Sequence, residues 1–123
     1  MTEMKQKAFA AWLDGQIALC KERRQALLTD ERGDEATFEK VRANVYDICR
    51  TLFAVAQRTC EGDAEAASRF FLLKTSQIPQ SWAAAYERAK RHGDAEKMAI
   101  EKLKLETVEE VKAAFTAMEE GAR

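Results

Sequence analysis

The chain has 123 residues, of which 46% are hydrophobic and 33% charged, and its formal net charge is −1 at pH 7. This balance is typical of one water-soluble domain, which we expect to span residues 1–123. A net charge this close to zero disfavours a dedicated nucleic-acid binder and a polybasic membrane anchor, because both need a clear excess of basic residues.

The sequence contains no signal that would direct it to a membrane or out of the cell. No apolar run approaches the roughly 18 residues that a membrane span requires. The run over 8–13 is too short for a secretory signal and ends at Asp14. We therefore expect a cytoplasmic protein with no membrane partner.

The first predicted helix runs from about Thr2, a potential N-cap, to about Thr29. Its apolar residues recur every three or four positions, as on one face of a helix. They are Phe9, Leu13, Ile17, Cys20 and Leu27. A turn over 30–33 follows, and Asp34 is placed to cap the next helix.

The second predicted helix, about 35–59, has the strongest periodicity in the chain. One heptad row consists of Phe38, Val41, Val45, Ile48, Leu52 and Val55. A second row consists of Cys49, Phe53, Ala56 and Cys60. An apolar face this broad touches two or more neighbours, so we expect this helix to lie at the centre.

The remaining helices are bounded by glycines, caps and the only proline. A short helix is predicted over about 64–75, and Pro79 suits the first position of another that stops at Gly93. Asp94 then caps a helix that runs to about Glu120. The predicted fold is all-α: an elongated up-down bundle of about five helices, in which three long helices, each roughly 38 Å, accompany a short helical hairpin over 64–92.

Few residues in the chain suit catalysis or metal binding. The three cysteines, Cys20, Cys49 and Cys60, are odd in number, lack C-x-x-C spacing and fall in apolar rows, which indicates core packing. The one histidine, His92, stands beside Gly93, where a basic residue complements a helix end. We expect no metal, no cofactor and no catalytic residue, and the sequence disfavours an enzyme.

Two basic residues interrupt apolar rows. Arg24 lies between Cys20 and Leu27, and Lys104 lies between Ile100 and Val108. Each can extend its charge into water, pair with a carboxylate, or line a pocket for an anion. The last possibility is the alternative function: a small-ligand or anion-binding domain.

A weaker alternative is nucleic-acid binding through the hairpin over 64–92. This segment has five basic and two acidic residues, and Arg88, Lys90 and Arg91 cluster at its end. Two short consecutive helices superficially suggest a helix-turn-helix. Basic residues at a helix C-terminus are expected on dipole grounds alone, however, so nucleic acid is disfavoured as a partner.

The function we expect first is protein–protein interaction, with self-association as a homodimer and without catalysis. Three long helices expose more apolar edge than one short hairpin covers, and a two-fold dimer would bury the remainder. The residues expected on that surface are Trp12, Leu28, Leu103 and Leu105.

Overall fold

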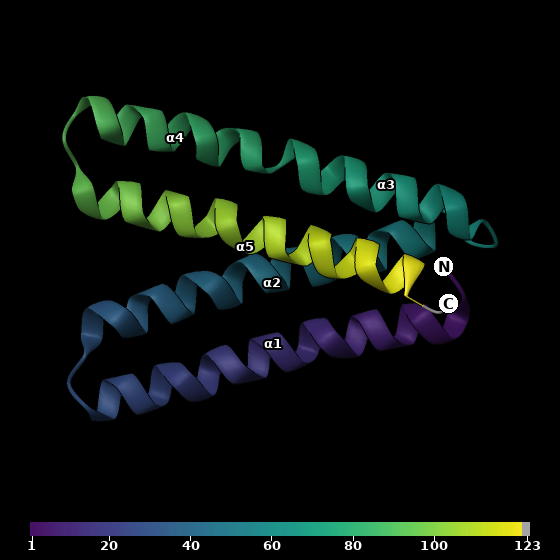
Figure 1. Ribbon diagram of the computed structural model, residues 1–123, viewed down its shortest axis with the longest axis horizontal. Helices are drawn as coiled ribbons and strands as arrows, with labels where there is room; N and C mark the ends of the chain where they lie inside the picture. Colours follow the sequence, from purple (N-terminus) through teal and green to yellow (C-terminus); the bar gives the residue numbers. More distant parts are fainter. Residues whose placement is uncertain (122–123) are drawn as a thin grey trace.

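A computed structural model describes residues 1–121, so residues 122 and 123 of the expected domain lie outside the described part. Five α-helices follow one another (Figure 1): α1 (Glu3–Thr29), α2 (Gly33–Thr59), α3 (Ala64–Gln77), α4 (Pro79–Arg91) and α5 (Ala95–Glu120). Residues 1–121 contain no β-strand. The prediction of an all-α bundle with three long helices is confirmed.

Local chemistry explains most of the helix ends. The side chains of Thr2, Asp63 and Asp94 each accept a hydrogen bond from a backbone N–H in the first turn of the helix that follows. Gly62 and Gly93 adopt φ of 80° and 68° in the turns after α2 and α4, a conformation that favours glycine. The expected cap Asp34 is wrong: α2 begins at Gly33, and its N-cap residue makes no side-chain hydrogen bond.

The connection between α3 and α4 differs from the expected hairpin. Ile78 links the two helices with φ −55° and ψ −43°, itself a helical conformation, so the chain does not reverse there. Pro79 has no N–H to continue the hydrogen-bond ladder and its ring displaces the preceding turn, which bends the rod. The segment 64–91 is therefore one bent rod. The chain reverses direction only at Gly93, so that α5 runs antiparallel to this rod (Figure 1).

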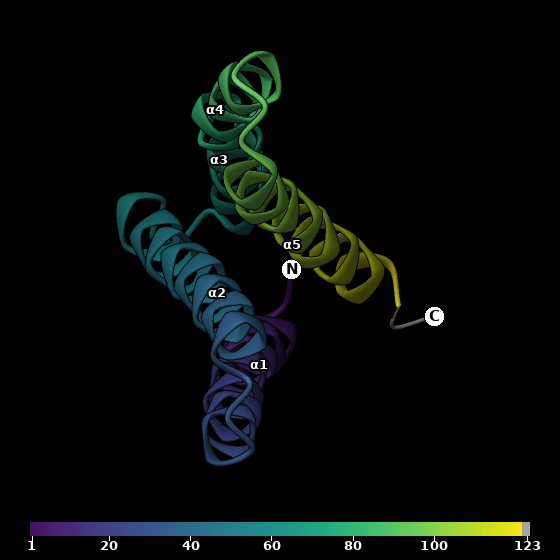
Figure 2. The same ribbon diagram turned by 90° about the vertical axis from the view of Figure 1, so that its left-hand side faces the viewer.

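The helices form two antiparallel arms, α1 with α2 and the α3–α4 rod with α5 (Figures 1 and 2). At the end that faces the viewer in Figure 2, helices α4, α5, α2 and α1 succeed one another in a row. Towards the far end α2 and α5 diverge, and α1 and α3 close the sides of a four-helix core. Between the arms, α2 and α5 share the most extensive packing.

Four phenylalanine rings join the arms at this four-helix end. Phe9, Phe53, Phe71 and Phe115 come from α1, α2, α3 and α5, and all six ring pairs have centroids 4.8 to 6.2 Å apart. Most of the pairs meet edge to face, an arrangement that the quadrupoles of the rings favour. We call these four residues the phenylalanine cluster.

Helix α2 is central, as predicted, but its second row is more deeply buried than its first. Cys49, Phe53 and Ala56 of the second row are buried, whereas in the first row Val45 is buried and Ile48 is 37% exposed. The reason is that α2 must touch both α1 and α5, and its second row faces the angle between them. The first row is consequently left partly open to solvent.

Candidate interaction surface

The two basic residues singled out in apolar rows lie in different surroundings. Arg24 is exposed. Lys104 is partly buried: its Nζ lies 3.2 Å from Glu101 Oε1 and 5.9 Å from the centroid of the Trp82 ring. Its charge is therefore already compensated, by a carboxylate and by a ring face. Neither Arg24 nor Lys104 lines the hollows described below.

The basic residues of α4 lie at the C-terminal end of the bent rod, next to the turn into α5. Arg88, Lys90 and Arg91 are exposed in its last turn, and His92 is the C-cap residue, whose backbone N–H donates to the Arg88 carbonyl. Because α3 does not fold back on α4, the structure does not bring these charges next to a second short helix.

Two of the three cysteine thiols, those of Cys20 and Cys49, are protected from ionisation by burial. Cys20 and Cys49 are buried, and Cys60 is partly buried. Burial, together with the nearby Glu39 carboxylate, raises the pKa of Cys20 to about 11. Burial raises the pKa of Cys49 to about 12. A thiol is nucleophilic and metal-binding only as the thiolate, so both groups are inert near neutral pH.

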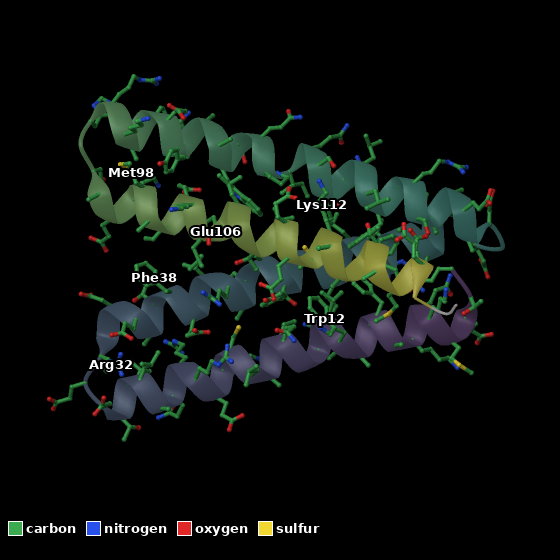
Figure 3. All side chains as sticks on the ribbon, in the orientation of Figure 1. Trp12, Arg32, Phe38, Met98, Glu106 and Lys112 are labelled. Atoms are coloured by element: carbon green, nitrogen blue, oxygen red, sulfur yellow. The ribbon has the colours of Figure 1, made fainter. Side chains whose placement is uncertain are left out.

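Two shallow hollows lie between the α1–α2 arm and α5. Figure 3 shows Phe38 from α2 and Trp12 from α1 both directed toward α5. The upper hollow, of about 210 Å³, lies between the first halves of α2 and α5. Its lining comprises Phe38, Arg42, Ala99, Lys102, Leu103 and Glu106. The lower hollow, of about 470 Å³, is lined by Lys5, Trp12, Ala114, Ala117, Met118 and Gly121.

A hydrogen bond between α2 and α5 lies between the two hollows. The Tyr46 hydroxyl donates a hydrogen bond of 3.0 Å to Glu110 Oε1, and the Trp12 ring meets the Tyr46 ring edge-on at 6.0 Å. Burial of Tyr46 and the Glu110 carboxylate raise the pKa of this phenol, so it remains a donor at neutral pH. The contact fixes α2 against α5 midway between the hollows.

One row of exposed residues runs along α5 on the side that borders both hollows, and we call it the α5 stripe. It consists of Ala95, Ala99, Lys102, Glu106, Glu110, Ala113 and Ala117. Leu103 lies beside this row; it is partly buried and lines the upper hollow together with Phe38. The α5 stripe and the two hollows together form one surface that is apolar in its recesses and charged along its middle.

An unpaired polar atom lies at the upper hollow. Arg42 Nε is buried and has no hydrogen-bond partner among residues 1–121, although the side chain of Arg42 lines the hollow. A buried donor without a partner costs about 1–3 kcal/mol. Glu39 Oε2, three positions earlier on α2, is likewise buried without a partner among residues 1–121.

Sequence reasoning found part of this surface. Trp12 and Leu103 were expected to be left over by the fold, and each lines a hollow. The roles of Arg42, Tyr46 and Glu110 were missed. Glu110 reads as a solvated carboxylate, and its partner Tyr46 is 64 positions away in the sequence. The sequence feature that could have indicated this surface is the recurrence of alanine along one exposed side of α5.

None of the helices described has a segment long and apolar enough to cross a membrane. The described residues also contain no group of three or more His, Cys, Asp or Glu side chains placed to hold a metal ion. Comparison of the chain with protein families, with curated proteins and with solved structures finds no match in any of the three.

Proposed function

We propose that this protein acts through protein–protein contact, as a helical module that self-associates into a two-fold dimer without catalysing a reaction. The observation that carries the proposal is the surface formed by the α5 stripe and its two hollows. Protein interfaces combine an apolar and aromatic centre with a polar rim. Here Phe38, Trp12 and Leu103 supply apolar area, and charges of both signs surround them.

The total surface area of the molecule agrees with this proposal. The chain exposes 7650 Å², whereas a compact monomer of 13.9 kDa exposes about 6,700 Å². An elongated arrangement with a row of helices at one end provides this surplus.

The charges on the surface favour a protein partner over a polyanion. Arg42 and Lys102 share the upper hollow with Glu106, so positive and negative groups lie side by side. A nucleic acid would meet an unfavourable carboxylate at each such point, because its backbone presents only negative charge. A protein surface can match both signs.

The test is the molar mass in solution as a function of concentration. Sedimentation velocity and light scattering over about 5–300 µM, a range that spans micromolar dissociation constants, should show a monomer converting to a dimer. A matched pair of variants locates the effect: Leu103→Ser should weaken the dimer, and Leu73→Ser should not. Leu73 is 54% exposed on α3, away from both hollows.

A monomer at every concentration in this range would contradict self-association. Far-UV circular dichroism of both variants checks that they remain folded. Because Leu103 is only partly buried, its truncation should leave the helix content unchanged. An equal effect of the Leu103 and Leu73 substitutions would exclude the α5 surface as the contact.

A further inference from the structure

The α5 stripe has the same spacing in both directions along the helix. Its successive members are separated by 4, 3, 4, 4, 3 and 4 positions, with Glu106 in the middle. The sizes of its side chains are also symmetric about Glu106. Two alanines stand at each end, and one charged residue, Lys102 or Glu110, stands on either side of the centre.

The charges of the stripe are opposite about the same centre. Lys102 lies on the N-terminal side of Glu106, and Glu110 lies at the equal distance on the C-terminal side. If two such stripes pack antiparallel with the two Glu106 residues opposite each other, each Lys102 faces the Glu110 of the other copy. If they pack parallel and in register, every charge faces its like, which costs energy.

We propose that the partner that covers this surface is a second copy of the chain, with the two α5 helices antiparallel and the two-fold axis passing at Glu106. This inference rests on the proposed self-association and specifies its geometry. In this register Ala99 faces Ala113 of the other copy, and Ala95 faces Ala117. Alanine at these contacts allows two helices to approach closely, and the paired length is about 33 Å.

The same register brings complementary groups to both hollows. The upper hollow, with Arg42 and Lys102, receives the acidic segment of the other α5, which includes Glu110. The side chains of Arg42 and Lys102, which line this hollow, thereby lie near carboxylate acceptors of the other copy. The lower hollow, with Lys5 at its rim, receives the start of the other α5, where Asp94 precedes Ala95.

The two Glu106 carboxylates meet at the axis and repel each other. The repulsion is reduced because Arg42 and Lys102 line the hollow that contains Glu106. The register therefore predicts that Glu106→Gln strengthens the dimer by a few-fold. An arrangement in which Glu106 faced a basic residue would instead be weakened by this substitution.

Disulfide cross-linking tests the position of the axis. Cys20 and Cys49 are buried, so in a Cys60→Ser background we expect neither to cross-link. A Glu106→Cys variant should then oxidise to a covalent dimer, because only a residue at a two-fold axis meets its own copy within the 4.4–6.8 Å between Cα atoms that a disulfide requires. The matched control is Glu109→Cys, which is also exposed on α5 but lies outside the stripe.

We expect the Glu106→Cys variant to cross-link faster than the Glu109→Cys variant, because only residue 106 lies within disulfide distance of its own copy in this register. If light scattering shows a dimer and the two variants cross-link at equal rates, the proposed register is wrong and self-association stands. If the parent chain is a monomer at every concentration, the proposed function fails by its own test and the register fails with it.

A charge exchange tests the pairing independently of cross-linking. Lys102→Glu should raise the dissociation constant of the dimer about tenfold, since it breaks two pairs at the symmetric interface. Glu110→Lys should do the same; because it also removes the acceptor of the Tyr46 hydroxyl, Tyr46→Phe is its control and should leave the dissociation constant within about threefold of that of the parent chain. The double variant restores both pairs with their signs reversed and should return to within about threefold of the parent chain. A double variant at least as weak as either single variant would overturn the register.

Discussion

The phenylalanine cluster holds the two arms together, and Phe71→Ala tests this role most severely. Phe71 is fully buried, and its ring centroid lies 5.6, 5.5 and 4.8 Å from those of Phe9, Phe53 and Phe115. Truncating a buried phenylalanine costs about 3–5 kcal/mol through lost burial and the cavity that remains. The loss of three ring contacts places this site at the upper end of that range, about 4–5 kcal/mol.

The assay is urea unfolding followed by circular dichroism, at a concentration low enough that association does not add to the apparent stability. A domain of this size is stable by about 5–15 kcal/mol, so Phe71→Ala removes a large part of the total. If that variant is unfolded without denaturant, Phe71→Leu provides the measurement, with an expected cost of about 1.5–2 kcal/mol. Leu73→Ala, at a residue 54% exposed on the same helix, should cost less than about 1 kcal/mol.

Two results would refute the assigned role of the cluster. One is a loss below about 2 kcal/mol for Phe71→Ala, because a site filled by three other rings leaves little room for collapse. The other is an unfolding curve of the parent chain with two separated transitions, one for each arm. A single transition is expected, since the cluster takes one ring from each of α1, α2, α3 and α5.

Three further predictions follow from the buried groups. In the folded state the pKa of Cys20 is about 11 and that of Cys49 about 12, against about 9.0 when unfolded. The contribution of these two protonated thiols to the free energy of unfolding is therefore complete below about pH 9. It is lost as the pH rises toward the folded-state pKa values, by at most about 1.4 kcal/mol per pH unit for each group. Urea unfolding at pH 8 and pH 10.5 measures this loss, and a flat profile for the parent chain, or one that Cys49→Ala leaves equally steep, would contradict it. Cys60 should react first with a thiol reagent at pH 8, and Cys20 and Cys49 only on unfolding; equal rates for all three would refute the burial assigned to them. Tyr46→Phe removes the donor to Glu110 and should lower the melting temperature by about 3–6 °C, and an unchanged melting temperature would show that the bond does not form in solution.

Sequence reasoning worked where the determinants are local. Thr2 and Asp94 cap helices as predicted, because a short polar side chain reaches a backbone N–H three residues further along the chain, whatever the rest of the chain does. The three-and-four spacing along α1 is equally local, and residues of its apolar row, such as Phe9 and Leu13, are buried.

The errors concern packing between distant segments. Ile48 and Cys49 belong to two equally apolar rows of α2, and only the positions of α1 and α5 decide which of them is buried. The direction of α4 depends on whether Ile78 adopts a helical or a turn conformation, and the sequence Ile78-Pro79 permits either outcome. Predicting such features requires the relative placement of the arms.

The surface on α5 was predictable in part for a related reason. Trp12 and Leu103 could be found because large apolar residues outside a core row need a partner. Arg42 and Glu110 could not, because each reads as an ordinary surface charge until α2 and α5 are placed side by side. Their importance comes from the hollows that the fold builds around them.

The central claim is that a second copy of the chain covers the α5 stripe in an antiparallel register, and contacts between methyl groups of the two copies test it most directly. In a mixture of isotopically labelled and unlabelled chains, only protons of different copies give nuclear Overhauser effects that pass the isotope filter. Ala99 and Ala113 are about 21 Å apart along one helix, so a contact between their methyl groups must join two copies. We predict contacts of Ala99 with Ala113 and of Ala95 with Ala117; a dimer that instead shows contacts between copies at Leu73, or at any surface away from α5, would contradict the claim.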